Sequence, residues 1–268
     1  MLQFKKICTW VLAGALVFSV AGCQPQTQPQ AQSEEPTAEQ ERFDAFIEKE
    51  FVDTMESDYT TAHVYLQDPE SFGVDPDKIS VSLGTRMDEE SQQASLDAFE
   101  ATCEEFRTFD RDELSAEQQD IYDIFDYQVS LSESLSDERF DYYAPMFESI
   151  SGLHYQLPTL FADWQLRNEE DVQDLITLMS DVRPYVDSAL EYTRTQEEKG
   201  LLMLDLDSVI SYCEGIVESG EDSAVLQAMN DSIAALELGE EKTAQYQEQL
   251  RTAFSDSFLS AYQDILDT

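Results

Sequence analysis

Apolar residues recur every three or four positions along most of the chain, which is the pattern of helices that bury one face. The longest such stretches are residues 37–59, 88–108, 115–129 and 241–268. The first and third open with Thr or Ser followed three residues later by Gln, the capping-box signature of a helix start. Asn168 precedes three acidic residues and is expected to cap another helix, because acids in a first turn oppose the helix dipole favourably.

Two stretches lack this periodicity. Residues 60–87 contain Asp-Pro turn signals, and residues 140–164 gather aromatic side chains with glycine and proline. The second stretch predicts a packed loop with short helical turns. Pro184 is expected to begin a helix that ends at Gly200. Further helices are expected near residues 206–218 and 224–236. The predicted fold class is all-α, in a multi-helix, elongated helical domain.

The last predicted helix has an apolar stripe that continues almost to Thr268. The stripe consists of Tyr246, Leu250, Phe254, Phe258, Tyr262 and Ile265. No capping glycine follows it, and the apolar face does not taper. We therefore expect its packing partner to lie beyond the end of the chain, which would leave an exposed apolar seam on this helix.

The first 22 residues have the three parts of an export signal. Lys5 and Lys6 supply a positive start, and the apolar residues 7–20 are too few to span a bilayer, which needs about 20. Residues 20–23 read Val-Ala-Gly-Cys and match the lipobox of bacterial lipoproteins. We therefore expect cleavage before Cys23 and lipid on its thiol. The alternative is an ordinary secretory signal with a chance cysteine.

The chain divides into a signal peptide (residues 1–22), a flexible tether (residues 23–36) and a helical domain (residues 37–268). The tether is polar and contains prolines, so it cannot form a core. A cysteine that carries more than one acyl chain is anchored stably. Membrane lipid is therefore the expected partner of Cys23, and the expected location is extracytoplasmic, on the cell membrane.

The charge of the chain limits its partners. There are 57 acidic and 15 basic residues, a net charge of −42. Loss of the two signal lysines gives the mature chain −44, that is −42 minus 2. Nucleic acid is excluded as a partner, because its phosphates would be repelled. An acidic surface could attract cationic peptides or divalent ions, but solubility in the extracellular medium is the favoured interpretation.

Two cysteines remain in the helical domain, Cys103 and Cys213. Each lies on an apolar helical stripe, where a small buried thiol is common. Outside the cytoplasm the two could instead form a disulfide. The sequence favours buried thiols and leaves the pairing open.

The sequence contains no HExxH, nucleophile elbow, P-loop or CxxC motif. The two histidines, His63 and His154, lie 91 residues apart, and His63 has no evident partner. We therefore predict no catalytic residue, no metal ligand and no cofactor site. His154 and Tyr155 are the candidates for lining a cleft, because binding residues concentrate on loops. The competing interpretation, a histidine hydrogen-bonded among packed aromatic side chains, is favoured.

Several stretches of the chain resemble the bacterial DUF885 family. They are residues 61–73 (TAHVYLQDPESFG), 114–125 (LSAEQQDIYDIF), 153–158 (LHYQLP) and 200–203 (GLLM). The resemblance runs from about Phe43 to the end and implies an all-helical zinc-peptidase fold, in a family of which many members are lipoproteins. The metal motif of that family, His-Glu-x-x-Pro-Gly-His, is absent here, so no zinc ligand or catalytic acid is assigned. The resemblance thus implies an N-terminal half, one wall of a substrate cleft, with zinc only in full-length relatives.

Two functions follow. The first is a truncated or split zinc-peptidase-like lipoprotein that is inactive alone and lacks a C-terminal half encoded nearby. The second is a non-enzymatic surface lipoprotein that binds a peptide or protein partner through the stretch around His154. The stripe on the last helix favours the first function. In both, this chain is expected not to be an enzyme by itself.

Overall fold

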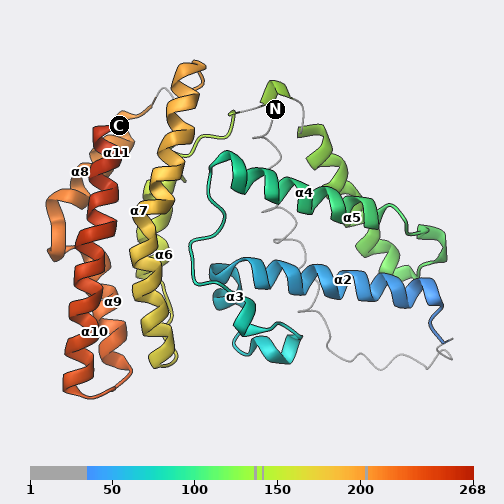
Figure 1. The fold of residues 1–268 in the computed structure, drawn as a ribbon, viewed down its shortest axis with the longest axis horizontal. Coiled ribbons are helices and arrows are strands. Elements are labelled where there is room, and N and C mark those ends of the chain that lie inside the picture. Colours follow the sequence, from blue (N-terminus) through green and yellow to red (C-terminus); the bar gives the residue numbers. More distant parts are fainter. Residues whose placement is uncertain (1–34, 136–137, 141, 203–204) are drawn as a thin grey trace. The chain divides into compact units, whose positions relative to one another are not determined.

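The structure is a computed structural model that describes residues 35–135, 138–140, 142–202 and 205–268. All regular elements within these ranges are helices, which confirms the all-α prediction (Figure 1). None of these helices is both long and apolar enough to cross a membrane. The export signal, Cys23 and the tether as far as residue 34 lie outside the described residues.

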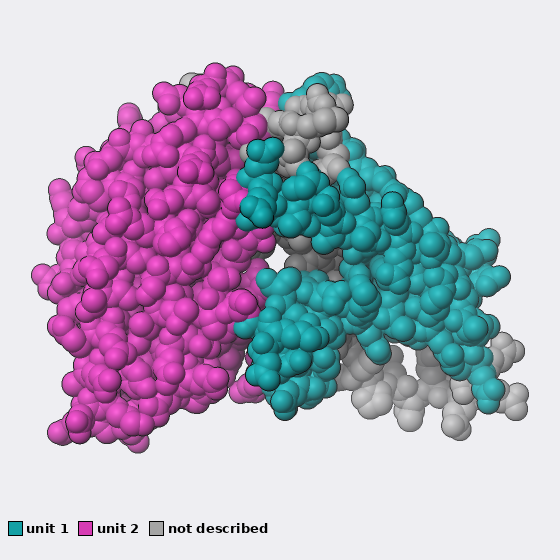
Figure 2. Space-filling view, in the orientation of Figure 1, with its two compact units in different colours: residues 1–57, 68–79, 89–141 teal, residues 58–67, 80–88, 142–268 magenta. Residues whose placement is uncertain are grey.

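The chain forms two compact units (Figure 2). Among the described residues, unit 1 comprises residues 35–57, 68–79, 89–135 and 138–140, and unit 2 comprises residues 58–67, 80–88, 142–202 and 205–268. The chain therefore contributes two short segments to unit 2 before it enters the long C-terminal part of that unit.

Unit 1 has an aromatic core. Its helices are α2 (Ala38–Ser57), α4 (Glu89–Phe106) and α5 (Ala116–Leu135), with the 3-10 helices η1 (Pro69–Phe72), η2 (Pro76–Lys78), η3 (Arg111–Glu113) and η4 (Glu138–Phe140). The ring centroid of Phe125 lies 5.5 Å from that of Phe46 and 4.7 Å from that of Phe106. Such aromatic pairs add about 0.5–1.5 kcal/mol beyond the burial of their area.

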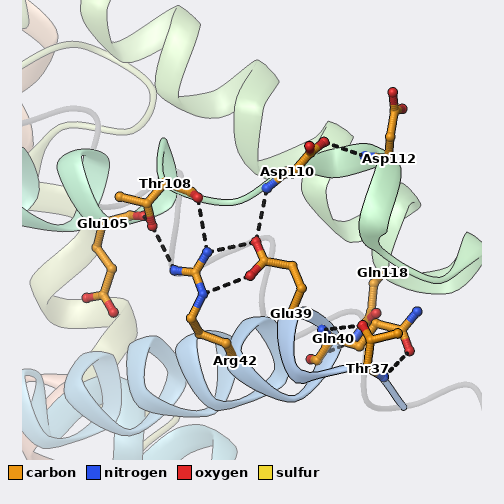
Figure 3. A network of polar contacts seen from close by, with 9 residues as sticks. All are labelled: Thr37, Glu39, Gln40, Arg42, Glu105, Thr108, Asp110, Asp112 and Gln118. Atoms are coloured by element: carbon orange, nitrogen blue, oxygen red, sulfur yellow. Dashed lines mark hydrogen bonds and ion pairs between the residues drawn. The ribbon is translucent and has the colours of Figure 1, made fainter. Parts of the chain in front are cut away.

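A polar network joins the start of α2 to the loop after α4 (Figure 3). The amide of Thr37 donates to Gln40 Oε1 (3.1 Å), and the amide of Gln40 donates to Thr37 Oγ1 (3.3 Å). This is the predicted capping box, and the box predicted for α5 is formed in the same way. The Arg42 guanidinium donates to the hydroxyl (2.7 Å) and carbonyl (3.0 Å) of Thr108 and also pairs with Glu39.

Unit 2 is built around one long helix. Its elements are α3 (Tyr59–Tyr65), α6 (Leu153–Ala162), α7 (Glu169–Glu198), α8 (Asp207–Ser219), the 3-10 helix η5 (Gly220–Asp222), α9 (Ala224–Ala235), α10 (Glu240–Ala253), the π-helix η6 (Phe254–Leu259) and α11 (Ser260–Asp267). The continuous run α10–η6–α11 packs along α7 (Figure 1).

The run α10–η6–α11 lies parallel to α7. Side-chain hydrogen bonds join Lys242 to Glu169 and Gln173 to Tyr246, each pair 73 residues apart, and join Ser257 to Arg183 and Arg194 to Thr268, each pair 74 residues apart. Because the offset stays at 73 or 74 residues along the whole length, the two helices run in the same direction. The increase of one residue occurs at η6, where a π-turn accommodates an additional residue.

The prediction that Pro184 begins a helix is wrong, and the packed loop predicted for residues 140–164 holds only before α6, for the same physical reason. Pro184 does not begin a helix but lies inside α7, and residues 140–164 include the regular helix α6 with Pro158 inside it. A proline in a helix leaves the carbonyl four residues earlier without its donor. Here the hydroxyl groups of Ser257 and Tyr262 donate to those carbonyls, so both helices continue.

The expected exposed seam on the last helix is also wrong. Leu250, Phe254, Phe258 and Tyr262 are each 0% exposed. The stripe packs against α7 and α8, and Phe258 lies edge-on to Phe161 of α6 with ring centroids 6.1 Å apart. The apolar face that lacked a partner in the sequence is thus buried by helices of its own unit.

Candidate functional site

One face of α7 carries the main polar cluster of unit 2. Its members recur at helical spacing and are Asp171, Asp174, Asp181, Tyr185 and Ser188. This face binds the two short segments of unit 2, residues 58–67 and 80–88. The cluster therefore fastens chain that precedes α7 by roughly a hundred residues.

His63 is the centre of the first contact. Its ring stacks on Trp164, with centroids 4.3 Å apart and planes inclined by 10°. Its Nε2 lies 2.8 Å from the carbonyl oxygen of Gln165, which can only accept, so Nε2 carries the proton of the neutral ring. Its Nδ1 lies 3.5 Å from the Tyr59 hydroxyl, which donates to Asp174 Oδ2 at 2.7 Å. The histidine without an evident partner in the sequence thus has several.

Arg167 binds the same group from the turn before α7. Its guanidinium donates to the main-chain carbonyl of His63 at 2.6 Å and lies 3.4 Å from His63 Nδ1. Its amide donates to Asp171 Oδ2 at 2.6 Å. Asn168 caps α7 as predicted, since its side-chain oxygen accepts from the amides of Glu170 and Asp171.

Burial determines the protonation of this cluster. It lowers the pKa of His63, and the positive charge of the Arg167 guanidinium lowers it further. The hydrogen bond to the Gln165 carbonyl acts in the opposite direction and raises the pKa. Burial raises the pKa of Asp174, although the Tyr59 hydroxyl bond lowers it, and burial raises the pKa of Tyr59 itself. The imidazole is therefore neutral near pH 7. The His63 side chain is only 6% exposed, and we assign it a role in holding residues 58–67 against α7.

Sequence reasoning missed these partners. The bonds of His63 and Tyr59 join residues 102 to 115 positions apart, a separation that no local motif reveals. One signal was available: Tyr59 and His63 are four residues apart, and Asp171 and Asp174 are three apart, so each pair shares a helix face.

The second short segment of unit 2, residues 80–88, binds further along the same face of α7. The amide of Leu83 donates to Asp181 Oδ2 at 2.9 Å, and Arg86 forms an ion pair with the same carboxylate. The Arg86 guanidinium lies 5.3 Å from the centroid of the Tyr185 ring, a cation–π distance. The amide of Met87 donates to the hydroxyl of Ser188 at 3.2 Å.

His154 lies in the first turn of α6 and is 2% exposed. Its ring lies edge-on to Tyr212, with centroids 5.4 Å apart, and its Nδ1 has no hydrogen-bond partner among the described residues. A Cβ added to Gly152 would lie 2.8 Å from this Nδ1, so glycine allows the close approach. Tyr155 is 48% exposed and also lies edge-on to Tyr212. The structure thus brings His154 and Tyr155 together with Tyr212, while His63 has a separate set of partners.

Burial lowers the pKa of His154, and the nearby charge of Glu148 opposes this shift. The Glu148 carboxylate accepts from the hydroxyl and amide of Ser151 and from the amide of Ile150, which lowers the pKa of Glu148. The carboxylate is therefore engaged by its own turn, and it does not bond the imidazole.

Cys103 and Cys213 are both buried, in unit 1 and unit 2 respectively. Burial raises the pKa of the Cys213 thiol to about 12. Since the thiolate is the reactive form, Cys213 is an inert core residue near neutral pH.

A groove of about 480 Å³ lies between α7 and the run α10–η6. It is lined by Ile176, Ser180, Arg183, Pro184, Gln249, Thr252, Ala253, Asp256 and Ser257. Its floor coincides with two backbone irregularities of unit 2, the proline in α7 and the π-turn of η6. Ser257 joins them, because its hydroxyl donates to the Ser180 carbonyl (3.0 Å) and accepts from the Arg183 amide (2.9 Å).

The family described as "Bacterial protein of unknown function (DUF885)" matches residues 70–268. The chain belongs to this DUF885 family. The resemblance seen in the sequence is thereby confirmed over all of unit 2 after residue 70 and over most of the described part of unit 1. Comparisons with curated proteins and with solved structures find no match to the chain. No cluster of His, Cys, Asp and Glu side chains arranged to bind a metal ion is found in the described part of this DUF885 member.

Proposed function

We propose that this DUF885 protein is an extracytoplasmic lipoprotein, anchored to the cell membrane through Cys23, that binds a peptide or protein partner without cleaving it. The anchor rests on the Val-Ala-Gly-Cys lipobox at residues 20–23, after an apolar stretch too short to span a bilayer. The binding role is favoured over the split-peptidase role because the stripe on the last helix, which had supported a missing half, is buried within unit 2.

The anchor is tested on the full chain in its bacterial host. Labelled palmitate should enter the wild-type protein and not a Cys23→Ala variant, and an inhibitor of lipoprotein signal peptidase should leave the longer precursor. A Cys103→Ala variant is the matched control, since it removes a cysteine of the helical domain and should keep the label. Label in the Cys23→Ala variant, or a wild-type protein released unlabelled, would contradict the proposal.

A second candidate function is the substrate-binding part of a zinc-peptidase-like protein whose metal motif is supplied elsewhere. It is supported by the DUF885 match over residues 70–268 in a sequence without His-Glu-x-x-Pro-Gly-His. The purified chain should then bind no zinc and hydrolyse no peptide alone. Zinc-dependent hydrolysis by the purified chain would exclude both candidates.

A further inference from the structure

The groove between α7 and α10–η6 is lined by a helix segment whose backbone is energetically unfavourable, because it contains Pro184. Proline inside a helix is destabilising by about 3 kcal/mol or more, because a hydrogen bond is lost and the ring crowds the previous turn. The Ser257 hydroxyl replaces the lost hydrogen bond, but Pro184 is exposed and lines the groove, so burial in the core does not offset the crowding by its ring. π-turns are often found at functional sites. An exposed proline beside such a turn therefore indicates that the shape of the groove serves a function.

The groove has the form of a peptide site. Its volume of about 480 Å³ falls within the range of ligand pockets, roughly 300–1,000 Å³. Ile176, Pro184 and Ala253 give it apolar surface, and both walls are helices that run in the same direction. A groove between two helices suits an amphipathic helical segment, which places apolar side chains between the walls.

The charged side chains that line the groove indicate the charge of its partner. Arg183 is neutralised by Asp264, with 2.9 Å between Nε and Oδ2, and the neighbouring Arg251 pairs with Glu248 at 2.7 Å. The side chains of Asp256 and Gln249, by contrast, form no hydrogen bond or ion pair with any described residue. The uncompensated charge of the groove is therefore negative and lies on its rim, where a partner's cation would meet it.

We infer that this groove is the site at which unit 2 binds its partner, and that the partner is a cationic amphipathic segment of a protein or peptide. Apolar side chains of the segment contact Ile176, Pro184 and Ala253, and a Lys or Arg pairs with Asp256. The Gln249 amide is free to bond the partner's main chain. This inference rests on the proposed binding function and names its surface and the chemistry of its partner.

The test uses the full chain as the cell makes it, in phosphatidylcholine nanodiscs, with empty nanodiscs as the blank. The probe is a fluorescent ten-residue peptide with leucine and lysine on opposite helix faces, and its scrambled sequence has the same charge. Asp256→Lys should weaken binding about tenfold by replacing attraction with repulsion, and Thr252→Trp should do so by filling the groove. Asp231→Lys and Gln227→Trp make the same changes on the exposed surface of α9 and should alter binding less than about twofold.

Three results would overturn the inference. One is equal binding of the scrambled peptide with equal weakening by Asp231→Lys, which would mean that general negative charge attracts the probe. Another is a photo-crosslinked peptide that attaches outside the groove, which would place the binding function on another surface. No binding of either peptide also overturns the groove assignment, while the palmitate label on Cys23 reports the anchor independently.

Discussion

The Tyr262 hydroxyl donates a hydrogen bond to the main-chain carbonyl of His154. That carbonyl lies four residues before Pro158, which has no amide hydrogen to offer it. In the same way, the Ser257 hydroxyl donates to the carbonyl of Ser180, which lies four residues before Pro184. The last helical run, α10–η6–α11, therefore supplies hydroxyl donors to the two carbonyls that the prolines leave without an amide donor. In this way it completes the backbone hydrogen bonding of α6 and α7.

Tyr262→Phe should lower the free energy of unfolding by about 1–3 kcal/mol, because a buried carbonyl loses its only strong donor. Urea unfolding of the full chain measures this. In a Pro158→Ala background the new amide at position 158 can donate to the His154 carbonyl, so the same tyrosine substitution should cost less than about 1 kcal/mol. Equal losses in the two backgrounds would show that Tyr262 acts through packing of its ring and not through the carbonyl.

Ser257→Ala should destabilise unit 2 by about 1–3 kcal/mol, since it removes both a donor to the Ser180 carbonyl and an acceptor for the Arg183 amide. The loss should shrink in a Pro184→Ala background, where a regular helical bond can form. Thr252→Ala, which removes an exposed hydroxyl from the same helix, should change stability by less than about 0.5 kcal/mol. Chemical denaturation of Ser257→Ala, Pro184→Ala, the double variant and Thr252→Ala measures these differences. It tests whether Ser257 stabilises unit 2 by bonding the carbonyl that Pro184 leaves without a donor.

The helices and caps of this fold could be predicted from the sequence because their signals are local. Thr37 with Gln40, and Asn168 with the acids after it, satisfy amides within one turn. The prolines could not be interpreted in this way. Whether a helix survives Pro158 or Pro184 depends on a hydroxyl more than seventy residues away, which only the folded packing of the last helix provides.

The candidate site shows the same limit. The family resemblance could be read from short stretches, and it holds over residues 70–268. The partners of His63 could not be read, because Trp164, Gln165 and Arg167 approach it only after the segment 58–67 docks on α7. The prediction that His154 and Tyr155 line a cleft remains a prediction. The groove of α7 and α10–η6 had no sequence signal beyond Pro184 itself.

Tyr59→Phe should destabilise the contact between segment 58–67 and α7. The Asp174 carboxylate would lose the hydroxyl that bonds it at 2.7 Å, and hydrogen bonds to charged groups contribute about 1.5–3 kcal/mol. Tyr65→Phe is the matched control, because Tyr65 is 59% exposed on the same helix. Amide hydrogen exchange of residues 58–67 should accelerate in the first variant and not in the second. Unchanged exchange in Tyr59→Phe would mean that His63 and Arg167 alone fasten this segment.

The stability of unit 2 should fall as the pH falls below about 6.5, the ordinary pKa of histidine in an unfolded chain. Burial lowers the folded-state pKa of His154, so below that pH the unfolded chain binds a proton that the folded protein rejects. The groups that face the ring do not reverse this sign: Glu148 is engaged by its own turn, and Tyr212, Tyr262 and Cys213 are uncharged because burial raises the pKa of each.

The measurement is the unfolding free energy between pH 5 and pH 8, with the histidine resonances followed by NMR. The chain has only two histidines, so the signals of His63 and His154 are separated by one variant each. Burial also lowers the pKa of His63, and each of His154→Gln and His63→Gln should therefore remove part of the acid slope. An acid slope unchanged in His154→Gln would show that the ring titrates freely and that its burial has no energetic consequence.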